Sequence, residues 1–133
     1  MCPITRRRFL SRPDWTFDNG RFGMRMEVLP DHVVVDRAWG DYRQQDTLRC
    51  FDVLDHVLEH LPGSVVVVED LSRLAGAENA ARRLYEAELL RRADRIQGVV
   101  FLGVGPMFRL FLRLGRRRNA IPFPMQAVDT WEQ

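Results

Sequence analysis

Lysine is absent from the chain, and all 20 basic residues are arginines. This absence excludes Schiff-base chemistry, a phosphate-loop lysine and a lysine general base. Cysteine is scarce too: Cys2 and Cys50 cannot form a disulfide framework and suit a reducing compartment. No apolar run approaches the length of a transmembrane helix. We therefore expect a cytoplasmic protein and no membrane contact.

Catalytic nucleophiles are also sparse. Ser11, Ser64 and Ser72 are the only serines, and none lies in a G-x-S-x-G motif. The formal net charge of +2 provides no strong field for nucleic acid. The 133 residues, 46% hydrophobic and 29% charged, are typical of one globular domain. We expect no enzyme activity, no cofactor and no nucleic-acid partner.

The N-terminus contains a motif that resembles a twin-arginine export signal, Thr5-Arg6-Arg7-Arg8-Phe9-Leu10. Such a signal requires an apolar stretch directly afterwards. The residues that follow, 11 to 15, are polar and interrupted by Pro13. We therefore expect residues 1–13 to form a flexible basic arm and residues 14–133 to form the single domain.

The first half of that domain has the pattern of an antiparallel hairpin. Asn19-Gly20 separates residues 15–18 from residues 21–28 and predicts a two-residue type I′ turn. In the second segment apolar residues alternate with other residues, as in a half-buried strand; they are Phe22, Met24, Met26 and Val28. We expect the next strand, residues 32–38, to run antiparallel to it.

Helices and strands then alternate. Asp41 with Gln44 resembles a capping box, so a first helix is predicted to begin at Gly40-Asp41 and to end at Leu61. The continuous valine run from Val65 to Val68 is typical of a strand buried on both faces. The remaining predicted elements are a strand over 64–70, a loop over 71–76, a helix over 77–92 with Glu78–Arg82 and Glu88–Arg92 pairs, a strand over 96–102, a helix from Pro106 to Gly115, and a strand over 121–128.

This order predicts an α/β fold with a mostly parallel sheet of four to five strands, an N-terminal antiparallel hairpin and helices packed on the sheet. Pro122 and Pro124 confine the last strand to an edge of the sheet, because neither residue can donate to a ladder.

A metal motif occurs on the first predicted helix. His56-Val57-Leu58-Glu59-His60 matches H-x-x-E-H, in which two histidines four residues apart could share a metal and the glutamate could act as general base. No third ligand is obvious downstream, and both histidines are on the polar face of the helix. We expect a solvated helix face, with His56, Glu59 and His60 as weak metal candidates only.

Two strand ends offer other sites. Glu69-Asp70 ends a strand where α/β folds place functional groups, but a phosphoacceptor aspartate would need a lysine that the chain lacks. Gly103-Val104-Gly105-Pro106 is a tight turn without the third glycine of a dinucleotide fingerprint. Gly103 and Gly105 stay candidates for a ligand or anion turn at this edge.

Two segments together resemble the STAS domain, the fold of bacterial anti-sigma-factor antagonists. Asp70-Leu71-Ser72-Arg73-Leu74 running into Glu78-Asn79-Ala80-Ala81 resembles the strand–loop–helix stretch of that family. Gly103-Val104-Gly105-Pro106-Met107-Phe108 resembles its later strand–turn–helix. Here the phosphoacceptor serine of the family falls on Ala80, which cannot be phosphorylated.

The resemblance implies a non-enzymatic protein-interaction domain in bacterial signalling or sigma-factor-type regulation. Its partner would be a serine or sensor kinase, another domain of a longer chain, or a second copy forming a homodimer. The implied partner-binding residues are Asp70, Ser72, Glu78, Asn79 and Ala80. Asp70 and Ser72 could instead only satisfy loop backbone groups. The alternative function is a small-ligand-binding α/β domain that uses the carboxyl edge of the sheet.

Overall fold

The computed structural model describes residues 15–105 and 121–128. Its elements, in chain order, are β1 (Thr16–Asp18), β2 (Phe22–Leu29), β3 (Val33–Tyr42), α1 (Gln44–Leu58), β4 (Val65–Ala77), α2 (Asn79–Arg91), a 3-10 turn (Ala93–Arg95), β5 (Ile96–Leu102) and β6 (Met125–Val128). The predicted arm over 1–13 and the predicted helix from Pro106 to Gly115 lie outside the described residues.

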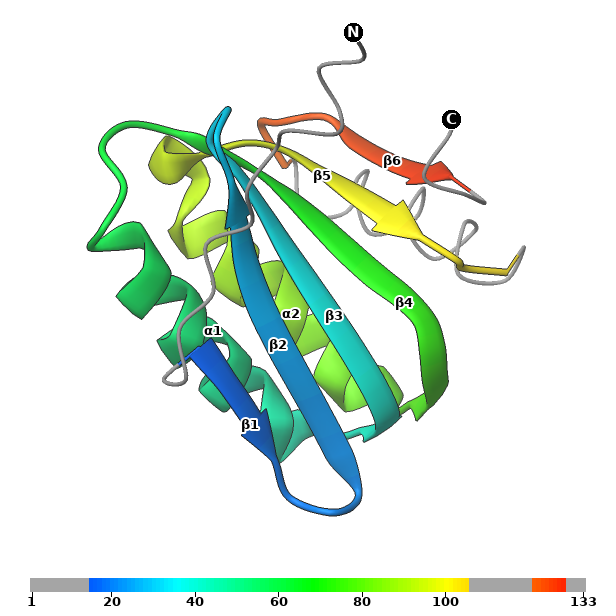
Figure 1. Cartoon of the computed structure of the whole chain (residues 1–133). Helices are drawn as coiled ribbons and strands as arrows, with labels where there is room; N and C mark the ends of the chain where they lie inside the picture. The colour runs from blue at the N-terminus through cyan, green and yellow to red at the C-terminus, as the bar shows by residue number, and fades with distance from the viewer. Residues whose placement is uncertain (1–14, 106–120, 129–133) are drawn as a thin grey trace, which may run out of the picture.

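The six strands form one sheet in the order β1-β2-β3-β4-β5-β6. The β1/β2 and β2/β3 pairs are antiparallel, and the other three pairs are parallel. Helices α1 and α2 lie side by side on one face of the sheet (Figure 1). The predicted α/β class, with antiparallel N-terminal strands and an otherwise parallel sheet, is confirmed, although the sheet has one strand more than the upper end of the expected range.

The main core lies between this face of the sheet and the two helices. The alternation predicted for β2 holds, because Met24, Met26 and Val28 are all buried in this core. Helix α1 contributes a stripe at helical spacing that includes Phe51 and Leu54. Each such fully buried side chain contributes about 1.5–3 kcal/mol relative to an exposed one.

The β1–β2 hairpin exists, but its turn is longer than predicted. β1 ends at Asp18 and β2 begins at Phe22, so residues 19 to 21 form the connection instead of Asn19-Gly20 alone. Gly20 has a positive φ of 87°, whereas Asn19 is not among the positive-φ residues that a type I′ turn would require at both positions. The Asn19 side-chain oxygen instead accepts hydrogen bonds from the backbone N–H groups of Arg21 and Phe22, at 3.1 and 2.8 Å. The side chain of Asn19 therefore organises a wider loop.

The predicted start of α1 was also wrong. Gly40 and Asp41 belong to β3, which continues to Tyr42, and the helix begins at Gln44 after an Arg43 cap. The acid that organises the helix N-terminus is Asp46, not Asp41, because its Oδ2 accepts the Arg43 backbone N–H at 2.8 Å. Strand pairing of β3 with β4 thus outweighed the local capping signal.

The segment predicted as a loop over 71–76 is strand. β4 continues for 13 residues to Ala77 and leads almost directly into α2. Its second half pairs with the extended end of β3, through Trp39↔Arg73, Gly40↔Leu74 and Tyr42↔Ala77, with two register irregularities. Since β5 stops opposite Asp70, this half of β4 has a ladder partner on one side only. The longer β3 therefore supplied backbone partners that local sequence did not predict.

Two further predictions concern the last strand and the ion pairs of α2. β6 lies at an edge of the sheet, as predicted, but it covers Met125–Val128 only, so the predicted strand residues 121–124, which include both prolines, are not strand. The Glu88–Arg92 pair is confirmed at 2.7 Å, and Arg92 also bonds Asp55 of α1 at 2.6 and 2.7 Å. Arg92 therefore ties the C-terminal end of α2 to α1.

Candidate functional site

The residues predicted to bind a partner divide into two groups. Asp70 and Ser72 lie within β4, whereas Glu78, Asn79 and Ala80 lie at the start of α2. Extended chain leads from Ser72 to Glu78 in six residue steps, which at about 3.3 Å each separate the groups by roughly 20 Å. The five residues do not form one contiguous site.

The Asp70 group is satisfied locally. Asp70 Oδ1 accepts hydrogen bonds from the Ser72 backbone N–H at 3.2 Å and from the Ser72 hydroxyl at 2.6 Å. The other Asp70 oxygen lies 3.9 Å from the Arg37 guanidinium. These contacts agree with the alternative interpretation from the sequence, in which Asp70 and Ser72 only satisfy nearby backbone groups.

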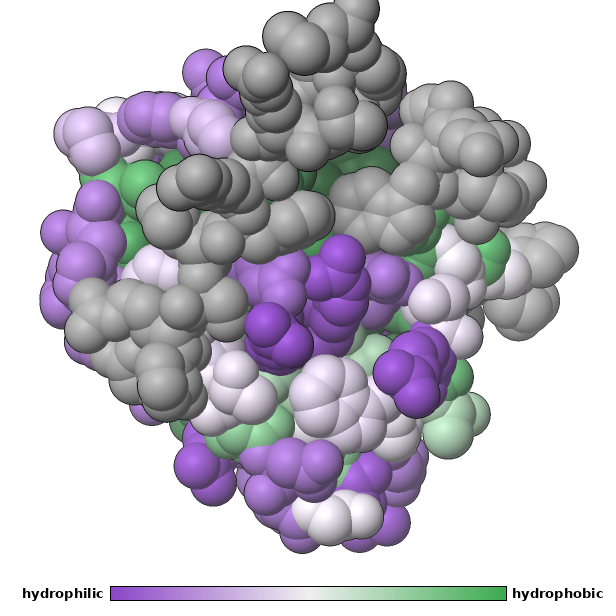
Figure 2. All heavy atoms as spheres, viewed as in Figure 1, coloured by the Kyte–Doolittle hydropathy of each residue, from purple (hydrophilic) through white to green (hydrophobic). Residues whose placement is uncertain are grey.

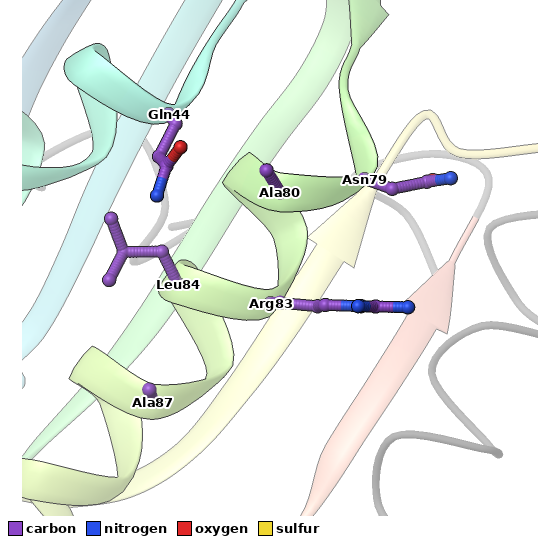
Figure 3. Close-up of a pocket in the computed structure, with 6 residues that line it drawn as sticks. All are labelled: Gln44, Asn79, Ala80, Arg83, Leu84 and Ala87. Atoms are coloured by element: carbon purple, nitrogen blue, oxygen red, sulfur yellow. The ribbon is translucent and has the colours of Figure 1, made fainter.

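The second group lies beside an open hollow. Glu78 caps α2, and its carboxylate accepts the backbone N–H of Gln44 at the start of α1. Next to it, Asn79 and Ala80 are exposed. The hollow has a volume of about 470 Å³ and is lined by Gln44, Asn79, Ala80, Arg83, Leu84 and Ala87. Figure 3 shows Gln44 and Leu84 on one side of α2, while the Asn79 and Arg83 side chains extend from the other side, away from Gln44.

The predicted glycine turn is tightly packed at its first glycine. Gly103 has a φ of +77°, and a Cβ there would lie 2.6 Å from the Cβ of Ser72. Its backbone N–H donates to the Val128 carbonyl at 3.1 Å. Gly105 is exposed, and a Cβ on it would meet nothing within 4 Å. Contact with Ser72 therefore fills the space at Gly103 that an anion would need, and Gly105 carries no feature of its own.

The H-x-x-E-H residues lie at the C-terminal end of α1. His56 is half-buried, Glu59 and His60 are exposed, and the two imidazole centroids are 5.5 Å apart. His60 Nδ1 is 2.9 Å from the carbonyl of His56, and the His60 ring stands edge-on to Trp15 at 6.0 Å. Across residues 15–105 and 121–128 no group of three potential ligands is arranged to hold a metal ion.

Sequence reasoning missed a pair of buried carboxyl groups. Asp36 of β3 and Glu69 of β4 are register partners, only 4% and 6% exposed, on the face that α1 and α2 cover. A hydrogen bond joins their side chains, and Tyr85 of α2 donates its hydroxyl to Glu69 Oε1 at 2.9 Å. Asp36 Oδ1 has no hydrogen-bond partner among the described residues.

The electrostatics of this pair favour a bound proton. Burial raises the pKa of Glu69 well above its usual value, and the charge and hydrogen bond of Asp36 raise it further. Burial also raises the pKa of Asp36, from 3.8 to about 6, although the hydrogen bond from Glu69 opposes the rise. The consistent arrangement at neutral pH is a protonated Glu69 that donates to an ionised Asp36.

A signal for the pair was present in the sequence. Asp36 follows the valines at 33 to 35, and Glu69 follows those at 65 to 68. Two adjacent parallel strands with an acid directly after each valine run bring the acids together if the runs are aligned. The observed Val33↔Val66 register provides that alignment.

The face of the sheet turned away from α1 and α2 is charged at its centre. Glu27 is only 7% exposed and pairs with Arg25 at 3.0 Å and with Arg37 at 2.7 Å. Arg37 links this cluster to Asp70. Figure 2 shows the hydrophilic side chains gathered over the middle of β2, β3 and β4. No helix in the described part of the chain combines the length and apolar character needed to cross a membrane.

Among known proteins, the similarity of this chain is one of fold. No family model and no curated protein matches the chain. A solved structure from Shewanella loihica PV-4, an uncharacterized protein of the DUF3478 family with a SpoIIAA-like fold, matches with a TM-score of 0.63 and 16% identity, over 84% of this chain and 88% of that one. The STAS resemblance is thus confirmed at the level of the fold, and the chain has a SpoIIAA-like, that is, STAS-like, fold.

Proposed function

We propose that this chain is a non-enzymatic protein-interaction domain of bacterial signalling or sigma-factor-type regulation, and that it binds its partner at the start of α2. The observation that carries the proposal is the position of Asn79 and Ala80. These residues, selected by the STAS resemblance, are exposed and line the hollow at the start of α2 (Figure 3). The partner would be a serine kinase, a sensor kinase or another domain of a longer chain.

The composition of the hollow suits a protein surface. Leu84 and Ala87 provide apolar contact one and two turns into α2, and Gln44 with Arg83 provides polar groups around them. Interfaces combine an apolar centre with a polar rim in this way, and arginine is enriched in them. An open hollow between two helix starts can accept a side chain of a partner without rearrangement of the sheet.

Regulation by phosphate at the usual position is not part of the proposal. Residues 76 to 82 contain no serine, threonine or tyrosine. Binding at this surface would therefore lack the serine switch of the antagonists, and control would come from elsewhere in the domain or from the partner.

No specific observation favours the small-ligand alternative. Its expected location, the carboxyl edge near Asp70 and Gly103, is filled by the contact between Ser72 and Gly103. The hollow lies at the start of α2, well away from that contact.

A site-directed crosslinking experiment tests the proposed surface. A photoreactive amino acid at Ala80 of the full chain, in the native host, should crosslink a kinase or another signalling domain. The same group at Glu59, an exposed residue at the opposite end of α1, is the matched control and should give no such product. Leu84→Asp should abolish the crosslink at Ala80 while the circular dichroism spectrum stays native. Equal products from both positions, or none from Ala80, would contradict the proposed surface.

A further inference from the structure

The contacts that hold α2 on the sheet differ along its length. At the C-terminal end, Arg92 bonds Asp55 and Glu88 and stacks over the Phe51 ring at 4.7 Å. At the N-terminal end, the Glu78 N–H donates to the Tyr42 carbonyl of β3 at 3.1 Å, and Thr47 of α1 lies 3.5 Å from the Ala81 carbonyl. In the middle of α2, the Tyr85 hydroxyl donates to Glu69 of β4. A buried acid is therefore the sheet partner of Tyr85, one turn and a half into the helix.

Among residues 15–105 and 121–128, no cation acts on the pKa of Asp36 or Glu69. The ionisable groups around the pair are Tyr42 of β3, Cys50 of α1, Tyr85 of α2 and, on the far face of β4, Asp70. Burial and the nearby acids raise the pKa of the Cys50 thiol and of both tyrosines, so these groups stay neutral. Arg37, which pairs with Glu27 and Asp70, lies on the opposite face of the sheet.

One bound proton gives the two carboxyl groups a hydrogen bond to each other. With that proton Glu69 donates to Asp36 and still accepts from Tyr85, so both carboxyl groups are served by one shared hydrogen and one hydroxyl. Without it, two adjacent carboxylates would share a dry interior with a single hydroxyl donor. Two unpaired buried charges cost several kcal/mol each, and admission of water relieves that cost. Water can enter if the part of α2 that covers the pair moves away.

We propose that the Asp36–Glu69 pair is a proton-operated device that fixes the first half of α2 to the sheet: a proton shared by the two carboxyl groups keeps Tyr85 anchored, and its removal releases residues 79–87. The inference does not depend on the proposed partner. It predicts local opening of α2 about the Arg92–Asp55 contact, with α1 unaffected.

Hydrogen exchange of the full chain between pH 5 and pH 8, corrected for the intrinsic exchange rate, measures this opening. The closed form holds a proton that the open form releases, so protection of amides 83–87 should fall by up to tenfold per pH unit over the range in which the pair keeps its proton. Amides within α1 should show no such slope. Equal slopes in the two helices, or no slope in α2, would overturn the proposal.

Two further measurements remove ambiguity. Glu69→Gln places a permanent donor beside Asp36 and keeps an acceptor for Tyr85, so above pH 6, where Asp36 is ionised, its α2 protection should not change with pH. Asp52→Asn removes an exposed carboxyl group of α1 and is the matched control, which should keep the wild-type slope. Carbon-13 NMR of the wild-type carboxyl groups stands independently of any variant: a Glu69 carboxyl that titrates at or below its ordinary pKa of 4.5 would also overturn the proposal.

Discussion

Two buried acid sites hold the two helices, and they rely on opposite protonation states. At the start of α1, Asp46 is 1% exposed and receives two hydrogen bonds from the Arg21 guanidinium, at 2.7 and 3.0 Å. Under α2, Asp36 and Glu69 face one another without a cation. The two sites therefore differ in charge: the α1 site requires a carboxylate, and the α2 site requires a proton.

The pKa values express this contrast. Burial alone would raise the pKa of Asp46, but hydrogen bonds from Arg21 and from the Arg43 backbone lower it below its ordinary 3.8. Burial raises the pKa of both members of the other pair, with no opposing cation. At Asp46, which lies nearer the surface, the hydrogen-bond partners outweigh burial, whereas at the deeper Asp36 and Glu69 burial prevails.

The largest expected effect comes from removing the cation of the α1 site. Arg21→Met should lower the free energy of unfolding, because it leaves the buried Asp46 carboxylate without its charged partner. Urea unfolding at pH 7 measures the loss. Arg43→Met is the matched control, because its exposed pair with Asp41 should contribute less than about 1 kcal/mol. Similar losses in the two variants would show that the α1 site does not depend on this buried pair.

The second effect concerns the α2 site, where the Glu69→Gln variant should become more stable relative to wild type as pH rises, and not less stable. The raised folded-state pKa values of Asp36 and Glu69 contribute stability that is complete below their unfolded values. That contribution declines as pH rises through the folded values, from about 4 to about 6 for Asp36 and to higher pH for Glu69. Glu69→Gln removes the Glu69 part, so its stability relative to wild type should increase with pH, by at most about 1.4 kcal/mol per pH unit. Urea unfolding at pH 5, 6, 7 and 8 checks the trend, and a constant difference would contradict it.

The third effect appears in acid. Because the folded-state pKa of Asp46 is lowered, its contribution is complete above pH 3.8 and is lost as the pH falls through the folded value. Between pH 5 and pH 2.5 wild type should therefore lose more stability than Arg21→Met, in which that pKa is no longer held down. Thermal unfolding in this range measures the difference. If wild type and Arg21→Met lost stability equally as the pH falls, the Asp46 carboxylate would not stabilise the start of α1 through Arg21.

The sequence predicted what depends on near neighbours in the chain. The alternation from Phe22 to Val28 and the valine runs placed strands correctly, because burial on one or both faces leaves a local pattern; for the last strand only the edge position was correct. It failed where a distant strand decided the outcome. Residues 71–76 are strand because β3 reaches Tyr42, and the Asp36–Glu69 contact depends on a parallel register fixed by the α1 crossover. The prediction that Asn79 and Ala80 lie on a binding surface came from the family resemblance, because no local sequence pattern marks these two residues.

The smallest effect compares two tyrosines, one for each helix. Tyr42 of β3 shares a 2.6 Å hydrogen bond with Thr47 of α1, whereas Tyr85 of α2 donates to Glu69 of β4. Each Tyr→Phe change should cost about 1 kcal/mol, the net contribution of one hydrogen bond. The Tyr42→Phe loss should stay constant from pH 5 to pH 8, because Thr47 does not titrate. The Tyr85→Phe loss should shrink as pH rises, because removal of the shared proton releases the first half of α2 and, with it, this hydrogen bond. Urea unfolding of both variants at each pH separates the two, and a pH-independent Tyr85→Phe loss would mean that Glu69 does not change its charge beneath α2.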